Sequence, residues 1–296
     1  MAKIHTLTVF TPTYNRRELI KRTYESLKAQ TLKDFVWLIA DDGSEDGTGD
    51  VIKGFIDEGI IDIEYHYFEN GGKMRAHNRG VELCDTELFV CLDSDDVFVE
   101  GAVEDLIGCY REIVSEDPFK KGILAGIVAH KGESGTKVLY GDEFPDVSYS
   151  TLFGLYLKGF KGETTLVFRT EVLKKYPFPE IEGEKYVPED YIYDKIDKDY
   201  VLKVLPKIIT VCEIVADGYT DSLKKIKKDN PVAWYLYYEQ RTMITEAGIL
   251  KFKYAGFYVI YAIRTRNKLY KKGSVPLFWV ISGIPAAFLI KLMKKD

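Results

Sequence analysis

The sequence predicts an α/β fold in which a mixed, mostly parallel sheet is flanked by helices and followed by a helical C-terminal extension. Two observations lead to this prediction. Up to about residue 92, short apolar runs typical of buried strands alternate with amphipathic runs typical of helices. From about residue 222 onward this alternation stops, and the chain becomes helical in pattern and rich in aromatic residues.

In the first part of the chain, each predicted strand is followed by a polar cluster. Strands are expected at residues 7–10, 34–40, 61–68 and 87–92, and helices at residues 16–30, 50–59 and 74–84. The clusters that follow the strands are TPTYNR, DDGSEDGT, ENGGKMR and DSDD. Because ligands of such sheets bind outside the carboxyl ends of the strands, we expect all four clusters to share one rim.

The second part of the chain is less regular. A strand is predicted at residues 123–130, a glycine-rich hairpin at 131–137, a helix near 148–159 and a strand at 163–169. Residues 176–190 contain too much proline and glycine for regular structure, and we interpret them as a closing loop. We expect one large domain over residues 1–215 and a helical extension over residues 216–296.

Composition narrows the class of protein. Of the 296 residues, 46% are hydrophobic, which is enough for a packed core. The chain has 41 lysines and arginines against 46 aspartates and glutamates, so no general basic field would attract nucleic acid. The cysteines lack zinc-site spacing and favour buried free thiols (Cys84, Cys91, Cys109 and Cys212). The N-terminus lacks a signal-peptide pattern, so we expect a cytoplasmic protein.

The DSDD cluster holds three carboxylates, Asp93, Asp95 and Asp96, directly after an apolar run. Like charges this close disfavour one another's ionisation, so the cluster needs compensation. A helix cap would need one aspartate, whereas Asp93 and Asp95 together could offer oxygen ligands to a hard divalent cation. Because magnesium is commonly held by one or two carboxylates plus substrate phosphates, we expect the cation to bind together with a diphosphate.

The other clusters have structural alternatives. DDGSEDGT could simply cap the following helix. ENGGKMRAHNRG could be a tight turn before a helix, although its flexible backbone and the cations Lys73 and Arg75 would also suit a phosphate. His77 in this stretch could line the site, whereas the other three histidines are expected at ordinary core or surface positions.

The ordered set of motifs resembles the family 2 glycosyltransferases of the GT-A fold. The motifs are VFTPTYNRRELIKRTYESLKAQTLKDFVWLIADDGSEDGT, ENGGKMRAHNRG and FVCLDSDDVF, in the family's order and at similar spacing. The match covers residues 4–115 closely and extends loosely to about residue 215. The resemblance implies a Rossmann-like GT-A catalytic domain over residues 1–215. It also implies inverting transfer of a sugar from a nucleotide-diphosphate sugar, which we expect to be a UDP-sugar.

The resemblance further implies roles for individual residues. Asp95 would ligate Mn²⁺ or Mg²⁺ that bridges the diphosphate. The residues expected to bind the nucleotide sugar are Thr11, Pro12, Tyr14, Asp42, Lys73, Asn78, Asp93 and Ser94. The catalytic base is expected at Asp190 in VPEDYIYDKI, with Glu184 and Asp194 as less favoured substitutes. Asp190 could instead cap the helix that follows it.

The implied chemistry is a single displacement. A base removes the proton from an acceptor hydroxyl as the oxygen attacks the anomeric carbon, and the metal stabilises the leaving diphosphate. Processive synthases of the family carry Gln-x-x-Arg-Trp, whereas EQRTMI here lacks both the spacing and the tryptophan. We therefore expect transfer of one sugar per encounter, to a glycan or lipid-linked saccharide in cell-surface polysaccharide biosynthesis.

The C-terminal segment VPLFWVISGIPAAFLIKLMKKD is the most apolar stretch of the chain. Its apolar run spans about sixteen residues and contains two prolines, whereas a spanning helix needs roughly twenty apolar residues. Basic residues flank the run, as in helices that lie in the plane of an anionic leaflet. We expect residues 275–293 to associate with the cytosolic face of the cell membrane. The alternative is packing on the catalytic domain.

Three other functions fit parts of the sequence. A haloacid-dehalogenase-like phosphohydrolase could use DSD as nucleophile and acid/base, but that motif usually opens the fold and precedes a threonine-type residue, whereas Val97 follows here. A sugar nucleotidyltransferase would carry a glycine-rich, arginine-containing loop after the first strand, which this chain lacks. A membrane-bound partner could keep the fold without catalysis.

Overall fold

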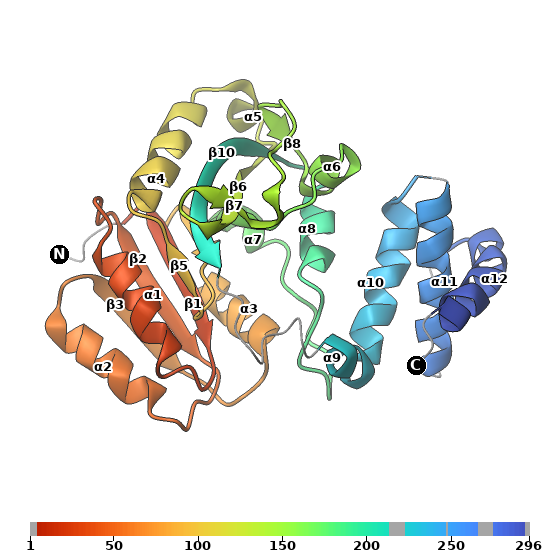
Figure 1. Cartoon of the computed structure of the whole chain (residues 1–296), viewed down its shortest axis with the longest axis horizontal. Coiled ribbons are helices and arrows are strands. Elements are labelled where there is room, and N and C mark those ends of the chain that lie inside the picture. The colour runs from red at the N-terminus through yellow and green to blue at the C-terminus, as the bar shows by residue number, and fades with distance from the viewer. Residues whose placement is uncertain (1–4, 213–222, 247, 266–274, 294–296) are drawn as a thin grey trace. The chain divides into compact units, whose positions relative to one another are not determined.

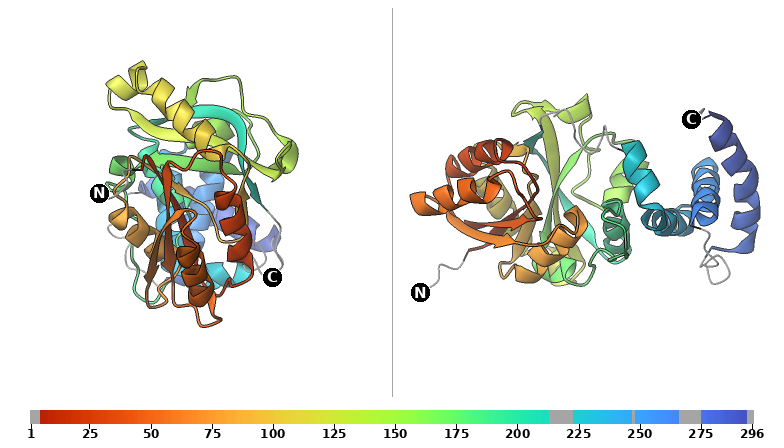
Figure 2. Two further views of the ribbon diagram at one scale, coloured as in Figure 1. Left: turned by 90° about the vertical axis from the view of Figure 1, so that its left-hand side faces the viewer. Right: turned by 90° about the horizontal axis from the view of Figure 1, so that it is seen from below.

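The structure is a computed structural model that describes residues 5–212, 223–246, 248–265 and 275–293. The chain divides into two compact units (Figures 1 and 2). Described residues within Met1–Phe178 and Ile192–Val215 form the first, which we call the sheet unit. Those within Pro179–Tyr191 and Ala216–Asp296 form the second, which we call the helical unit. Most of the segment that we interpreted as a closing loop therefore belongs to the helical unit.

In the described part of the sheet unit, ten strands form one mixed sheet. They are β1 (Leu7–Thr13), β2 (Phe35–Asp41), β3 (Asp62–Tyr67), β4 (Leu88–Cys91), β5 (Asp96–Phe98), β6 (Leu124–Ser134), β7 (Lys137–Val138), β8 (Tyr149–Ser150), β9 (Thr164–Arg169) and β10 (Val201–Cys212). Their order is β3-β2-β1-β4-β9-β6-β10-β5, with β7 beside β6 and β8 beside β10. Strands β1 to β4 run parallel, and β9 runs antiparallel to both of its neighbours.

Helices cover both faces of this sheet. The helices that begin in the first 200 residues are α1 (Leu19–Lys28), α2 (Thr48–Glu58), α3 (Lys73–Leu83), α4 (Ala102–Ile113), α5 (Asp117–Lys120), α6 (Leu152–Leu157), α7 (Thr170–Leu173) and α8 (Asp190–Ile196). Strand side chains alternate between faces, so Val9 joins the core with α1, α2 and α4, while Phe10 meets α3. A Cβ on Gly80 of α3 would lie 2.2 Å from the Phe10 ring, so this close approach requires glycine. The predicted α/β fold is thus confirmed.

Three strands were not expected from the sequence: β5, β8, which lies where a helix was predicted near residues 148–159, and β10. Strand β10 contains Pro206, which cannot donate a backbone hydrogen bond, and its register with β6 shifts between Leu205 and Ile208. Strand β5 begins at Asp96 and pairs antiparallel with β10, where Cys212 is its partner. The acidic cluster is therefore divided between the turn after β4 and the start of a new strand.

The helical unit is formed around aromatic side chains. Its helices are α9 (Leu223–Asp229), α10 (Pro231–Ile244), α11 (Ile249–Arg264) and α12 (Leu277–Met293). Trp234 and Tyr235 of α10 pack with Tyr258 and Tyr261 of α11. The preceding loop joins this unit because the Glu184 carboxylate accepts hydrogen bonds from two backbone N–H groups in the first turn of α10. Within the described ranges, no helix is both long and apolar enough to cross a membrane.

Candidate functional site

Hydrogen bonds and an ion pair connect the polar clusters that follow β1, β2, β3 and β4. After β1, the backbone N–H of Asn15 donates to Ser44 in the cluster after β2, at 2.8 Å. The β2 cluster is in turn bonded to the loop after β3 through Asp42. The loop after β3 leads into α3, whose first residue, Lys73, pairs with Asp93 after β4. The prediction that the four clusters share one rim is confirmed.

Asp42 fixes the glycine loop that precedes α3. Its two carboxylate oxygens accept hydrogen bonds from the backbone N–H groups of Gly71 and Gly72, each at 2.8 Å. Gly72 has φ of +94°, a conformation that favours glycine. Asp42 is buried and its carboxylate is occupied by the backbone, so it positions the start of α3 and the side chain of Lys73.

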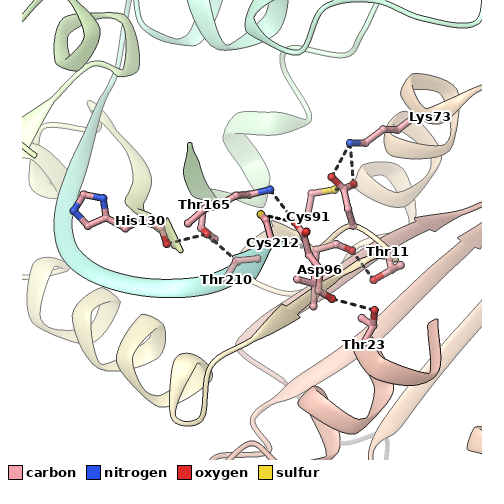
Figure 3. Close-up of polar contacts among 12 residues, drawn as sticks. Thr11, Thr23, Lys73, Cys91, Asp96, His130, Thr165, Thr210 and Cys212 are labelled. Atoms are coloured by element: carbon pink, nitrogen blue, oxygen red, sulfur yellow. Dashed lines mark hydrogen bonds and ion pairs between the residues drawn. The ribbon is translucent and has the colours of Figure 1, made fainter. Parts of the chain in front are cut away.

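Lys73 neutralises the first acid of the DSDD cluster. Its Nζ lies 2.8 Å from Oδ1 and 3.0 Å from Oδ2 of Asp93 (Figure 3). Burial acts to raise the pKa of Asp93, but the positive charges of Lys73 and Lys131 outweigh it and hold that pKa below its usual range. Asp93 is therefore an ionised carboxylate with a cationic partner from α3.

Lys131 neutralises the third acid. Its Nζ lies 3.0 Å from Oδ2 of Asp96, which also accepts a hydrogen bond from the Cys212 thiol at 3.3 Å (Figure 3). Burial alone would lower the pKa of Lys131, but the charges of Asp96 and Asp93 reverse this and raise it. Burial raises the pKa of the Cys212 thiol to about 12, so it is a protonated donor at neutral pH.

Asp95 differs from the other two acids of the cluster. Burial raises its pKa, and the negative charges of Asp93 and Asp96 add to the effect, while its own backbone N–H and the charge of Arg16 oppose it. No lysine, arginine or histidine of the described ranges forms an ion pair with it. Two lysines therefore already pair with Asp93 and Asp96, two of the three acids for which we expected a divalent cation.

The carboxylates at this rim could supply only a small part of the ligands that a metal ion needs. Among the described residues, no group of three or more histidine, cysteine, aspartate and glutamate side chains is arranged to hold an ion. Within the DSDD cluster, Asp95 is the acid that has no ion-pair partner among the described residues. Such a set fits a magnesium- or manganese-type ion that takes most of its ligands from substrate phosphates and water, and it does not fit an all-protein cage.

Several of the residues expected to bind the nucleotide are buried or form hydrogen bonds within the protein. The Thr11 hydroxyl is fully buried, donates to the Leu92 carbonyl at 2.8 Å and accepts from the Trp37 indole at 2.9 Å. Ser94 is buried, and its carbonyl accepts a hydrogen bond from Thr23 on α1. Pro12 is buried in β1, whereas 49% of Tyr14 is exposed just beyond that strand. Tyr14 therefore presents an accessible aromatic ring at the rim.

Asn78 and His77 lie on α3, and their contacts are with the rest of the sheet unit. The Asn78 amide donates to the Phe178 carbonyl and accepts from the Phe178 N–H, both at 2.9 Å. His77 is buried in edge-on contacts with Phe10, Phe89 and Phe178. His77 is therefore buried in the core, and Asn78 anchors the chain at Phe178.

Asp190 belongs to the helical unit and begins α8. Its Oδ2 lies 2.9 Å from Nη2 of the buried Arg241 and 3.5 Å from the Tyr237 hydroxyl, both on α10. Partial burial raises the pKa of Asp190; Arg241 opposes this shift and Glu189 adds to it. Of the two substitutes, Glu184 caps α10, as described above, and Asp194 is buried in α8.

The sequence did not predict the roles of two charged residues, Lys131 and Arg241. We interpreted Lys131 only as part of a glycine-rich hairpin and Arg241 only as part of a departure from a processive motif. Lys131 could have been found because it follows the apolar run of β6, as the other rim clusters follow their strands. No local signal marks Arg241, whose partner is 51 residues away.

The fold and the charged rim define a GT-A-type α/β protein, in which the carboxyl ends of parallel strands carry the candidate site. Residues 8–176 match the family described as glycosyl transferase family 2. The chain belongs to this family.

Relatives and solved structures agree with this assignment. The chain is 25% identical over 179 residues to a GalNAc(5)-diNAcBac-PP-undecaprenol beta-1,3-glucosyltransferase of Campylobacter jejuni, covering 59% of this chain and 55% of that protein. It spans 36% and 15% of two glycosyltransferases from Streptococcus pneumoniae, so it matches well under two thirds of these relatives.

Two solved structures share the fold. Residues 1–349 of TarS from S. aureus with UDP-GlcNAc superpose with a TM-score of 0.62 at 18% identity, covering 95% of this chain and 79% of that one. A mannosyltransferase from Pyrobaculum calidifontis with GDP-Man and Mn²⁺ gives a TM-score of 0.58 at 17% identity, covering 99% and 80%.

Proposed function

We propose that this chain is an inverting, metal-dependent glycosyltransferase that moves a sugar from a nucleotide-diphosphate sugar, of the UDP type, to a glycan or lipid-linked saccharide. The observation that carries the proposal is that the three acids of the DSDD cluster differ in their ion-pair partners. Asp93 and Asp96 are neutralised by lysines, whereas Asp95 is partly buried with a raised pKa and no ion-pair partner among the described residues. A divalent cation that arrives with a diphosphate would supply the missing charge.

In this proposal, Asp95 ligates Mn²⁺ or Mg²⁺, which when bound would neutralise charge on the leaving diphosphate. Lys73 and Lys131 form ion pairs with the neighbouring acids Asp93 and Asp96. The exposed ring of Tyr14 offers a stacking surface for the base. Asp42 contributes by fixing the loop from which Lys73 begins α3.

We assign the general base to Asp190. A base with a raised pKa accepts a proton more readily than an ordinary carboxylate, and the shift at Asp190 has this sign. Arg241 holds one oxygen of the carboxylate at 2.9 Å, so it fixes the orientation of the group. Asp190 would take the proton of the acceptor hydroxyl as that oxygen attacks the anomeric carbon, with inversion of configuration.

The relatives support the classes of donor, cofactor and acceptor. One structural neighbour was solved with UDP-GlcNAc and another with GDP-Man and Mn²⁺. The name of the Campylobacter relative specifies an undecaprenol-linked saccharide, a lipid-borne acceptor. An acceptor of this kind would place the enzyme at the cytosolic face of the membrane, in cell-surface polysaccharide biosynthesis.

The test is release of nucleotide diphosphate from a panel of UDP- and GDP-sugars, with Mn²⁺ and with chelator. We expect metal-dependent release by the wild type, its loss in Asp95→Asn, and no change in Asp57→Asn, a control on the exposed surface of α2. Phosphate release from a monoester would instead support the phosphohydrolase. Absence of both activities, with intact binding of nucleotide sugar, would support a non-catalytic role.

A further inference from the structure

Helix α12 packs on α11 through small residues. Gly283, Ala286 and Ala287 of α12 are buried against α11. A Cβ on Gly283 would lie 2.6 Å from the Ala255 carbonyl oxygen, so the two helices approach too closely for a larger residue. The contact covers one face of α12 and leaves the opposite face uncovered.

The uncovered face of α12 is made of large apolar side chains. Ile281, Ile284, Phe288 and Leu292 recur at spacings of three and four residues, so they lie on one side of the helix. Between 57% and 65% of each is exposed. Leu277, Phe278 and Leu289 flank them and are at least 52% exposed. A helix that is apolar all round is normally covered on every side by protein or lipid, and this helix is covered on one.

Charge indicates which occupant covers this face. Residues 223–296 contain 15 lysines and arginines against four aspartates and glutamates, whereas residues 1–222 contain 26 against 42. Positive charge is thus concentrated in the segment that carries α12. An anionic lipid surface would attract this segment, whereas a second copy would bring the same positive charge and be repelled.

The dimensions of α12 define how it would bind. At 1.5 Å per residue, its 17 residues extend about 25 Å, less than the roughly 30 Å of a bilayer's hydrocarbon core. Its other face is held by α11, which prevents it from being surrounded by lipid. Both facts favour a helix that lies in the plane of the membrane with one face inserted.

We propose that the exposed face of α12, formed by Leu277, Phe278, Ile281, Ile284, Phe288, Leu289 and Leu292, docks the protein onto an anionic lipid bilayer. This inference deepens the proposed function by naming the surface that would bring the enzyme to a lipid-borne acceptor. Vesicle binding requires no catalysis, so failure of the docking surface and failure of the proposed activity can be told apart.

The experiment measures flotation of the full chain with vesicles of phosphatidylcholine, with and without phosphatidylglycerol. The wild type should float with the anionic vesicles and much less with the neutral ones. Ile281→Ser combined with Phe288→Ser should reduce binding on the order of tenfold or more, because two inserted side chains lose their apolar surface. The matched control is Ile60→Ser with Leu157→Ser, which changes two exposed apolar residues of the sheet unit and should bind like the wild type.

Circular dichroism and thermal unfolding establish that each variant is folded. Absence of wild-type binding to anionic vesicles would overturn the proposal, as would undiminished binding by the α12 variant. A concentration-dependent dimer that the α12 substitutions abolish, without vesicle binding, would show that a second copy covers this face and would also overturn it.

Discussion

Lys131 and Asp96 form a largely buried ion pair that spans a strand: the Lys131 Nζ on β6 lies 3.0 Å from Asp96 Oδ2 on β5, and β10 lies between these two strands in the sheet. Only 18% and 7% of the two side chains are exposed. Together with the pair of Lys73 and Asp93, this leaves Asp95 as the acid of the DSDD cluster without an ion-pair partner among the described residues.

Lys131→Met should destabilise the sheet unit strongly. The substitution leaves Asp96 buried without a cation, and loss of one partner of a buried pair costs about 3–5 kcal/mol of unfolding free energy. Urea unfolding measures the change. Lys137→Met is the control, because its pair with Glu133 is exposed and should contribute no more than about 1 kcal/mol. Equal midpoints for the two variants would contradict the prediction.

Asp42→Asn should loosen the loop before α3. An amide has one acceptor oxygen, so one of the N–H groups of Gly71 and Gly72 loses its partner, at a cost of about 1–3 kcal/mol. Because that loop positions Lys73, the KM for the nucleotide sugar should also rise. Asp50→Asn, at an exposed site on α2, is the control. If Asp42→Asn leaves both the unfolding midpoint and KM unchanged, the positioning role is wrong.

Arg241→Gln should change the pH dependence of catalysis. Loss of the guanidinium leaves burial and Glu189, which both raise the pKa of Asp190, opposed only by the Tyr237 hydrogen bond. We expect that pKa to rise further, so the acid limb of the kcat profile moves to higher pH.

The donor KM should change little in Arg241→Gln, and Arg241→Lys should restore part of the wild-type profile because it keeps the charge. Steady-state kinetics across the pH range measures both effects. A uniform loss of activity at every pH, with an unshifted profile, would show that Arg241 only supports the fold.

Tyr24→Phe should reduce the amount of unfolding free energy that the protein loses as the pH rises above about 10. Burial raises the pKa of Tyr24 to about 12, and its hydrogen bond to Glu58 at 2.8 Å adds to the effect. The unfolded chain ionises this group near pH 10, so the stability from the neutral phenol is complete below that pH and is lost as pH rises through about 12. Guanidinium unfolding at pH 8 and at pH 11 measures it. An unchanged slope in the variant would refute the assignment.

The sequence alone determined the order of the strands and helices up to about residue 92 and the rim where polar clusters gather. Apolar runs such as residues 34–40 mark buried strands through local pattern, and parallel strands put whatever follows them on one edge. The ordered motifs then led to the family. Strand β10 was not predicted because Pro206 interrupts the sequence pattern of a strand. The register of β10 with β6 shifts beside this proline.

Only the tertiary structure shows which of the acidic side chains have a cationic partner. Asp93, Asp95 and Asp96 are chemically alike in the sequence, and their difference comes from Lys73 and from Lys131, the latter 35 residues beyond its partner Asp96. Arg241 and Asp190 are likewise 51 residues apart. Local patterns specify strands and helices because backbone geometry repeats every few residues. Pairing of distant side chains depends on how those elements pack, which no local pattern encodes.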